Sequence, residues 1–200
     1  MAKTQSPVAR AKQIKLLLFD VDGVLTDGKL YIFPLSVAGE SSNKGDDAFG
    51  PVLEVKGFHA HDGMGISIAH LAGLKTGLIT KRVSATVALR ARDLKMEYVR
   101  QGIHDKRAAF EEILRQAGLT ASEAAYVGDD IIDLPVMRHC GLAIAVANAR
   151  AEVKREAHYV TAHSGGDGAS RDAVEFILKA QGKWKQVVER YIGGKAALST

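Results

Sequence analysis

The sequence lacks the features that mark secreted and membrane-spanning proteins. It has one cysteine, Cys140, in 200 residues, which excludes an intrachain disulfide and favours a reducing compartment. No apolar run reaches the roughly 18 residues of a membrane helix. The basic stretch 1–15 has no apolar core of a secretory signal. These absences predict a cytoplasmic protein with no membrane partner, and the apolar context of Cys140 predicts a packed thiol rather than a reactive one.

The sequence also lacks a strong excess of either charge. Its net charge is +4, and the basic residues are spread along the chain with some clustering near the C-terminus. A nucleic-acid-binding protein usually has a focused basic stripe, so a surface that attracts small anionic substrates explains the charge equally well. A nucleic-acid-binding module stays open as an alternative, although we expect no nucleic-acid partner. The 46% hydrophobic and 25% charged content is ordinary for one globular domain.

One stretch near the N-terminus carries the strongest signal. An apolar run, Leu16 to Phe19, ends in Asp20-Val-Asp22-Gly23. Such a run is typical of a strand buried in a parallel sheet, and ligands bind at the carboxyl ends of such strands. Residues i and i+2 of an extended segment point the same way, so Asp20 and Asp22 are expected to face one cation or substrate. The alternative is that both acids only form a polar turn.

The rest of the chain predicts a doubly wound α/β domain. Two β-type runs, 29–33 and 52–58, flank a stretch rich in Gly, Ser, Asn and Asp and predict a hairpin with a long tip. Beyond it strands and helices alternate, which implies a mostly parallel, Rossmann-like sheet. The expected strands are 76–80, 97–100, 125–127, 142–146 and 158–160, and the expected helices are 64–71, 84–94, 105–117, 131–139, 150–157 and 169–181. The domain is expected over 14–182, with the hairpin at about 29–58, no cap domain, a frayed lead-in at 1–13 and a terminal extension at 183–200.

Polar side chains follow several of these strands. Thr80 and Arg82 follow the second strand of the sheet, Lys106 opens the helix after the third, and Asp129 and Asp130 follow the fourth, with Asp133 further on. Parallel strands end at one edge, so these groups are expected to meet. Carboxylates, a lysine and a hydroxyl around one crevice suit a phosphate and Mg²⁺, and a carboxylate can attack phosphorus. Singly, Thr80 could simply end a strand and Lys106 could be an ordinary first-turn residue.

These residues resemble the four motifs of the haloacid dehalogenase (HAD) superfamily, in the same order and on the same elements. The resemblance covers roughly 14–182. The chain is most similar to the uncapped subclass of 3-deoxy-D-manno-octulosonate 8-phosphate (KDO 8-P) phosphatases. The matching stretches are Asp20–Gly28, Phe58–Ile66, Tyr126–Met137, Ala157–Thr161 and 180–183. The resemblance implies a HAD-like fold and a Mg²⁺-dependent phosphoric monoester hydrolase that releases KDO and phosphate in lipopolysaccharide precursor synthesis.

The resemblance also implies roles for individual residues. Asp20 would be the nucleophile, and Asp22 would protonate the leaving oxygen and then activate water. Thr80 and Lys106 would hold the phosphate. Mg²⁺ would be bound by Asp20, the backbone carbonyl of Asp22, and Asp129, while Asp130 and Asp133 would act through water or support Lys106. The implied substrate-binding residues are Asp22, His59, Ala60, His61, Asp62, Gly63, Ser67, Arg82, Arg90 and Lys106.

Assembly is implied as well. Relatives form homotetramers whose hairpins pair, so we expect a homotetramer in which Glu54, Lys56 or the C-terminal tail reaches a neighbouring site. Arg82 and Arg90 are expected two turns apart on one helix face, where they would bind the sugar carboxylate.

Several positions depart from the family pattern. His61 and Ser67 stand where arginines are usual, Lys81 replaces a common glycine, and Asp167 replaces an arginine. A phosphatase for another ulosonate 9-phosphate, a broad phosphomonoesterase and a non-catalytic subunit therefore stay open. A zinc site at His59, His61 and His70 lacks further ligands at suitable spacing, and a Ca²⁺ loop at 128–130 lacks the other EF-hand positions.

Overall fold

A six-stranded, fully parallel sheet forms the centre of the molecule. The computed structural model describes residues 5–34 and 52–193. The strand order is β5-β4-β1-β6-β7-β8, with every neighbouring pair parallel. The strands are β1 (Leu16–Phe19), β4 (Lys75–Ile79), β5 (Tyr98–Arg100), β6 (Ala124–Gly128), β7 (Leu142–Ala145) and β8 (Tyr159–Val160). The strands expected from the sequence are all present.

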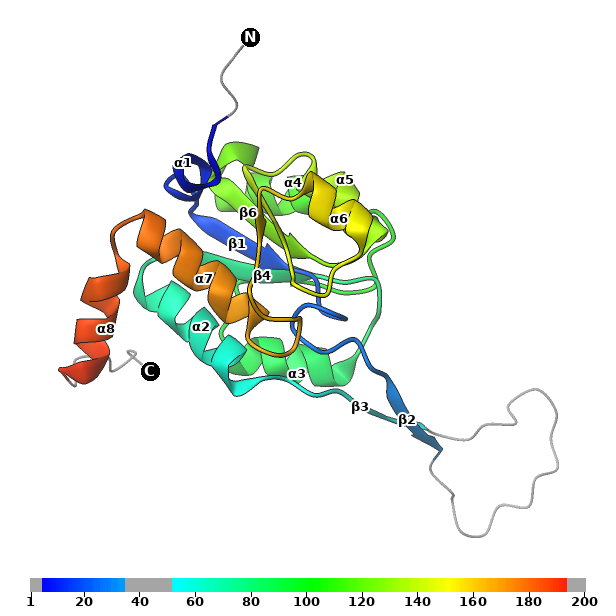
Figure 1. The fold of residues 1–200 in the computed structure, drawn as a ribbon. Helices are drawn as coiled ribbons and strands as arrows, with labels where there is room; N and C mark the ends of the chain where they lie inside the picture. Colours follow the sequence, from blue (N-terminus) through cyan, green and yellow to red (C-terminus); the bar gives the residue numbers. More distant parts are fainter. Residues whose placement is uncertain (1–4, 35–51, 194–200) are drawn as a thin grey trace, which may run out of the picture.

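Helices cover both faces of this sheet, which confirms the doubly wound architecture (Figure 1). One face carries α2 (Ala60–Leu71), α3 (Ala85–Asp93) and α7 (Ala169–Ala180). The other carries α4 (Lys106–Ala117), α5 (Leu134–Met137) and α6 (Ala151–Glu156). Short 3₁₀ turns lie at Ala121–Glu123 and Ile131–Asp133. No helix in the described part of the chain has both the length and the apolar character needed to cross a membrane.

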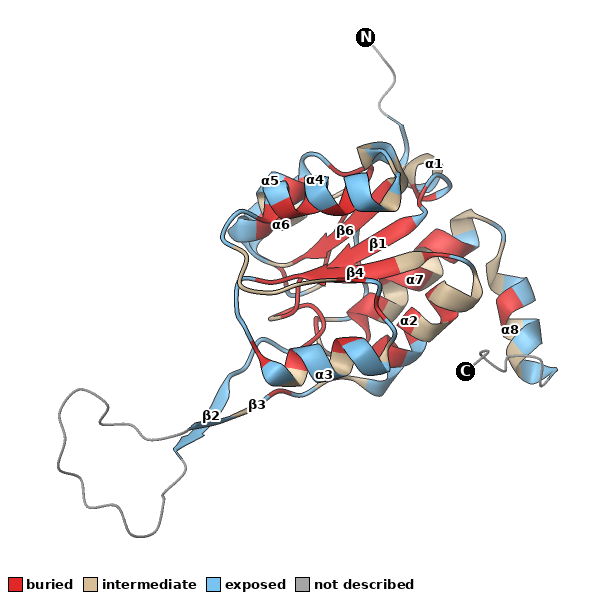
Figure 2. Cartoon of the chain, turned by 180° about the vertical axis from the view of Figure 1, so that it is seen from behind, coloured by how far each residue is buried: buried red, intermediate tan, exposed pale blue. Residues whose placement is uncertain are grey.

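The core surrounds β1, which has a strand on either side. All four residues of β1 are fully buried, and Figure 2 shows the sheet as the buried centre between exposed helix faces. Burying each leucine of β1 stabilises the fold by about 1.5–3 kcal/mol. The strand that leads to Asp20 is therefore held on both edges and both faces, which fixes the position of the carboxylate at its end.

Helix caps fix the loops that lead into the site. Ser84 caps α3 by accepting a hydrogen bond from the Val87 amide at 3.4 Å, and Asp105 caps α4 through the Ala108 amide at 3.0 Å. Each cap satisfies an amide that the helix leaves without a partner. Because Asp105 is the N-cap of α4, Lys106 lies in its first turn at the edge of the sheet.

Both terminal extensions contain a helix in their described residues. Residues 1–13 were expected to be a frayed lead-in, but Pro7–Ala11 forms the helix α1. Gln181 fixes it by donating to the carbonyls of Ala11 and Ile14 at 3.1 and 2.7 Å. The C-terminal extension contains α8 (Trp184–Ile192), and the Lys183 ammonium ties its start to the carbonyl of Ala72 at 3.1 Å.

Two element boundaries also differ from the expectation. The helix expected over 131–139 is a 3₁₀ turn followed by the short helix α5, with Pro135 in the first turn of that helix. Proline lacks the amide hydrogen that a continuing helix needs. The strand expected over 52–58 ends at Val55.

The hairpin leaves the body of the molecule near the carboxyl edge of the sheet (Figures 1 and 2). Its strands, β2 (Tyr31–Pro34) and β3 (Val52–Val55), are antiparallel, with Tyr31 opposite Val55. The expected long tip lies outside the described residues. Six large apolar side chains of the hairpin are roughly half exposed: Tyr31, Ile32, Phe33, Val52, Leu53 and Val55.

Candidate active site

The candidate site lies at the carboxyl ends of the three central strands. Asp20 follows β1 and Thr80 follows β4; their amides donate to the carbonyls of Val127 and Arg100 on neighbouring strands. Asp129 follows β6. The structure brings Asp20 and Asp129 together in one cluster of carboxylates, and Thr80 directly follows β4, the strand that neighbours β1 in the sheet. Asp20 and Thr80 are both buried.

Lys106 connects the helix α4 to the carboxylates of this edge. Its ammonium lies 2.9 Å from Asp20 Oδ1 and 2.8 Å from Asp133 Oδ1, and the side chain is almost fully buried. Burial alone would lower the pKa of Lys106, but the negative charges of Asp133 and Asp20 outweigh it and raise that pKa. The lysine therefore stays charged at neutral pH. It can offset the negative charge of an entering phosphate.

Asp133 is the structural hub beneath the site. It is completely buried, and its Oδ1 accepts from Lys106 and from the Tyr126 hydroxyl, both at 2.8 Å. Its Oδ2 accepts from the amides of Asp129 and Asp130 at 3.0 and 3.3 Å. Both oxygens are thus occupied, so Asp133 orients its neighbours rather than offering a free ligand atom.

Tyr126 is a site residue to which sequence reasoning assigned no role. It lies in β6, is fully buried, and its hydroxyl also lies 3.4 Å from the Lys106 ammonium. Burial raises the pKa of this hydroxyl well above its usual value, so it stays protonated and donates to Asp133. The available signal was a tyrosine in a buried strand, whose hydroxyl must find a partner.

The carboxylate cluster carries more negative charge than Lys106 compensates. Carboxylate oxygens of Asp20, Asp129 and Asp133 lie within 4.8 Å of one another, and those of Asp133 already accept hydrogen bonds. Asp129 Oδ1 is buried, and no residue in the described part of the chain forms a hydrogen bond with it. Burial and the charge of Asp133 raise the pKa of Asp20 from 3.8 to about 7. Burial and the charges of Asp133 and Asp20 raise that of Asp129 to about 7 as well. A hard divalent cation with oxygen ligands would relieve this repulsion, so the donor set fits Mg²⁺.

Glycines allow the loops to close around this cluster. Gly23 has φ +92°, and a Cβ at that position would overlap the Asp129 carboxylate. Gly165 and Gly166 approach the same loop so closely that a Cβ on either would overlap its backbone. The Gly166 amide donates to the carbonyl of Val24 at 3.0 Å. The two loops therefore support each other beside the cluster.

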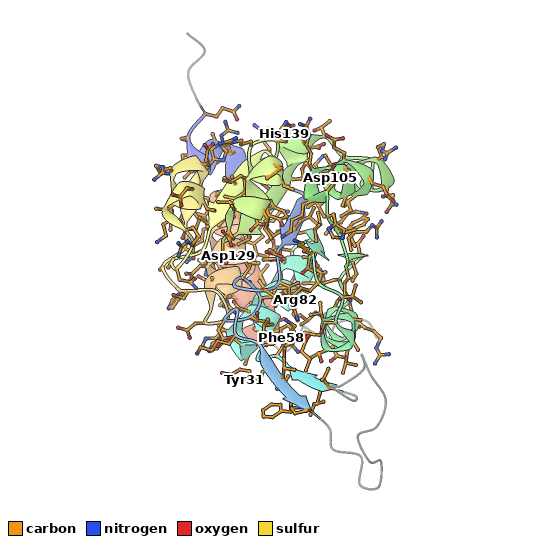
Figure 3. The ribbon with its side chains drawn as sticks, turned by 90° about the vertical axis from the view of Figure 1, so that its right-hand side faces the viewer. Tyr31, Phe58, Arg82, Asp105, Asp129 and His139 are labelled. Carbon is orange, nitrogen blue, oxygen red and sulfur yellow. The ribbon has the colours of Figure 1, made fainter. Side chains whose placement is uncertain are left out.

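Asp22, the second acid of the motif, lies in a different environment. Its Oδ1 binds the Lys56 ammonium at 2.5 Å, and its Oδ2 lies 3.8 Å from Arg82 Nε. Glu54 contacts both cations, at 3.4 Å each. Glu54, Lys56 or the C-terminal tail was expected to reach a neighbouring site, but Glu54 and Lys56 form these contacts around Asp22 within their own chain. Figure 3 shows Arg82 between Asp129 and the hairpin that carries Tyr31.

The expected substrate residues around the start of α2 have different surroundings. His59 is the N-cap of α2, and its ring lies 3.8 Å from Asp167 and edge-on to His61. Ala60 is the first residue of α2. Asp62 is buried, and its carboxylate accepts from the amides of Gly168 and Arg171 at 3.2 and 3.0 Å. Asp62 therefore holds the start of α7 in place.

The remaining expected substrate residues lie on α2 and around α3. Ser67 donates to the Gly63 carbonyl one turn earlier at 3.2 Å. Arg90 packs against Gly63 and over the Phe58 ring. Its Nε is buried and has no hydrogen-bond partner among the described residues. Arg82 precedes the Ser84 cap, so it lies in the loop before α3. The expectation that Arg82 and Arg90 share a helix face is wrong, because the helix begins only after that cap.

Comparisons with known proteins agree with this geometry. Residues 80–171 match the family model of haloacid dehalogenase-like hydrolases. The Escherichia coli K12 protein 3-deoxy-D-manno-octulosonate 8-phosphate phosphatase KdsC is 38% identical over 176 residues, which cover 88% of this chain and 85% of that protein.

Solved structures extend the similarity to three dimensions. A KDO 8-P phosphatase from Moraxella catarrhalis, in complex with magnesium, phosphate and KDO, matches with a TM-score of 0.81 and 32% identity, covering 92% of this chain and 97% of that one. A probable phosphatase from Pseudomonas syringae matches with a TM-score of 0.82 and 40% identity, covering 94% and 98%. The chain therefore belongs to the haloacid dehalogenase superfamily, in the family of KDO 8-P phosphatases.

Proposed function

We propose that this chain hydrolyses KDO 8-P to KDO and phosphate, with Mg²⁺ as its cofactor. The chain is a phosphoric monoester hydrolase of the family identified above. The main support for the proposal is the buried cluster at the sheet edge. In it Lys106 binds Asp20, and Asp129 lies beside Asp20 with its buried Oδ1 unpaired among the described residues. We place the reaction in lipopolysaccharide precursor synthesis in the cytoplasm. The single cysteine, Cys140, which excludes an intrachain disulfide, is consistent with that compartment.

Asp20 is the proposed nucleophile. Lys106 and the Val21 amide both bind its Oδ1, which leaves Oδ2 to attack phosphorus. A bond forms between Oδ2 and phosphorus while the bond from phosphorus to the sugar oxygen breaks, and Asp22 gives its proton to that oxygen. Asp22 then takes a proton from water, whose oxygen attacks phosphorus and releases phosphate from Asp20.

The remaining residues hold the phosphate and the cation. Lys106 and Thr80 lie at the same sheet edge and are the proposed phosphate ligands. Asp20, Asp129 and the backbone carbonyl of Asp22 would hold Mg²⁺, since both oxygens of Asp133 already accept hydrogen bonds. When bound, the cation offsets charge on the phosphate oxygens.

Selection of the sugar acid is proposed to rest on Arg82 and Arg90. Arg82 is 44% exposed and only loosely paired, with contacts of 3.4 and 3.8 Å, so a carboxylate ligand can replace Glu54 as its partner. Arg90, beside Gly63, has a buried Nε to which residues 5–34 and 52–193 offer no hydrogen-bond acceptor. His59, Ala60, His61, Asp62 and Ser67 complete the proposed substrate surface around the start of α2, Asp62 by holding the loop before α7.

Phosphate release from a panel of phosphorylated sugars, with and without Mg²⁺, tests the assignment. We expect KDO 8-P to be preferred, with Arg82→Ala losing far more kcat/KM on KDO 8-P than on a neutral sugar phosphate of similar size. Arg92→Ala, at an exposed position of the helix α3 that follows the Arg82 loop, is the control and should change kcat/KM on neither substrate. A wild-type enzyme that prefers another ulosonate 9-phosphate, or shows no preference for acids, would move the assignment to one of the alternatives that His61 and Ser67 leave open.

We also propose a homotetramer in which hairpins pair between subunits. The support is the row of half-exposed apolar side chains on β2 and β3, since an unpaired apolar strand edge invites association. Light scattering should give four times the 21.4 kDa chain mass. An Ile32→Asp and Leu53→Asp double variant should give a smaller species. A monomeric wild type at micromolar concentration would contradict the proposal.

A further inference from the structure

The hairpin brings a buried lysine to the second carboxylate of the site. Lys56 directly follows β3, and its side chain has no exposed surface. Its ammonium binds Asp22 Oδ1 at 2.5 Å and lies 3.4 Å from Glu54 Oε1. Desolvating an ammonium costs several kcal/mol unless opposite charges compensate it. The two carboxylates are the compensation, so the three groups form one unit.

Each acid of the Asp-Val-Asp motif thus has its own buried lysine. In the described part of the chain the two buried lysines are Lys56 and Lys106. Lys106 binds Asp20 and Lys56 binds Asp22, and neither lysine forms an ion pair with the other acid. The pairing of Lys106 with Asp20 is part of the proposed mechanism. The pairing with Lys56 has no role in it.

Asp22 depends on this contact for its orientation. The side chain of Asp22 is 24% exposed, so packing alone does not fix it. Its only other charged contact within residues 5–34 and 52–193 is Arg82 Nε at 3.8 Å, beyond hydrogen-bond distance. Arg82 is itself 44% exposed. Lys56 is therefore the one firmly held group that fixes where the carboxyl of Asp22 points.

We infer that Lys56 is the positioning residue for proton transfer by Asp22, holding its carboxyl toward the leaving sugar oxygen. This inference rests on the proposed function, in which Asp22 protonates that oxygen. Lys56 acts through Asp22 and does not touch the reacting atoms. In the reaction the bond between phosphorus and oxygen breaks, the oxygen takes the proton of Asp22, and Lys56 neither gains nor loses one.

The hairpin strands hold Lys56 beside Asp22. Val55 of β3 pairs with Tyr31 of β2, so the strand that precedes Lys56 is held by the strand that follows the catalytic loop. Glu54, on the same strand, contacts Lys56 and Arg82 from the other side. The hairpin strands thus fix the ammonium of Lys56 relative to Asp22.

A comparison of leaving groups separates this role from a structural one. An alkoxide leaving from a sugar phosphate needs a proton, whereas p-nitrophenolate leaves without one. Because kcat/KM reports only steps up to departure of the leaving group, it isolates the protonation step from the later attack of water. Lys56→Met should lose about 10²-fold in kcat/KM on KDO 8-P and less than about threefold on p-nitrophenyl phosphate, as expected when only acid catalysis is lost.

Two further variants complete the experiment. Lys29 is an exposed lysine at the base of the same hairpin, and Lys29→Met should leave kcat/KM unchanged on both substrates. Glu54→Gln, which removes the second partner of Lys56, should show a smaller loss with the same preference for KDO 8-P. This variant keeps the test decisive if Lys56→Met does not fold.

The possible results distinguish this inference from the proposed function. Equal losses on the two substrates by both Lys56→Met and Glu54→Gln, or no loss by either, would overturn the role of Lys56 while leaving the proposed function in place. A wild-type enzyme that releases phosphate from p-nitrophenyl phosphate but from no sugar phosphate would overturn the proposed substrate class. A wild-type enzyme that turns over neither KDO 8-P nor p-nitrophenyl phosphate would overturn both the proposed function and the role of Lys56.

Discussion

Protons and Mg²⁺ should compete for the carboxylate cluster. The pKa values of Asp20 and Asp129 are raised to about 7 by burial and by the neighbouring negative charges. A carboxyl with a pKa near 7 is about 90% ionised at pH 8 and about 10% ionised at pH 6. If both groups must be ionised to bind the cation, the apparent affinity for Mg²⁺ falls about 100-fold between pH 8 and pH 6.

Isothermal titration calorimetry with Mg²⁺ at pH 6, 7 and 8 measures this directly. The dissociation constant should rise steeply below pH 7, and binding near pH 7 should release protons. Asp129→Asn should weaken binding at pH 8 and flatten the pH dependence, whereas Asp93→Asn, an exposed carboxylate on α3, should change neither. A wild-type dissociation constant that varies less than about threefold across this range would refute the raised pKa values, because carboxyls at 3.8 stay ionised throughout.

The same linkage acts on stability without the metal. Between pH 3.8 and about 7, the native state holds more protons at Asp20 than the unfolded state. The free energy of unfolding therefore falls as pH rises through this window, by up to about 4 kcal/mol for Asp20. Because Mg²⁺ binds the ionised native state, it should raise Tm more at pH 8 than at pH 6. An equal rise in Tm at pH 6 and pH 8 would contradict competition between protons and Mg²⁺.

Three substitutions test individual supports of the site. Gly23→Ala should weaken Mg²⁺ binding at least about tenfold, since its Cβ would overlap the Asp129 carboxylate. Gly57→Ala, where a Cβ has open space, is the control, and equal affinities would refute the steric argument. Tyr126→Phe should cost about 1–2 kcal/mol of stability through the lost bond to Asp133, and unchanged denaturant unfolding would count against that bond. Asp62→Asn should lower Tm by about 3–5 °C, whereas an unchanged Tm with lost activity would make it a substrate contact.

The core of the site could be predicted from the sequence because its residues are positioned by the direction of the strands that precede them. Parallel strands end at one edge, so a parallel sheet was enough to place Asp20, Asp129 and Lys106, each at or just after a strand end, on the same side of the domain. The fold was predictable for the same reason, since β1 is apolar throughout and strands alternate with helices. Capping residues such as Ser84 and Asp105 set helix starts locally and could be recognised without tertiary information.

Contacts that depend on tertiary geometry could not be predicted. Lys56 reaches Asp22 across 34 residues, and this contact depends on how the hairpin leaves the sheet. Tyr126 acts through Asp133, which local patterns assign to an exposed helix face as readily as to a buried hub. The helix α1 has five residues and no periodicity, and its order depends on hydrogen bonds from Gln181.

The central claim is that Asp20 is the nucleophile of a Mg²⁺-dependent phosphatase. The most direct test is the initial rate of phosphate release from KDO 8-P by wild type and by Asp20→Asn, with Mg²⁺ and after its removal by a chelator. We expect turnover by the wild type only with Mg²⁺, and a loss of at least about 10³-fold in the folded Asp20→Asn variant. Phosphate release by Asp20→Asn at a rate near that of the wild type would contradict this claim.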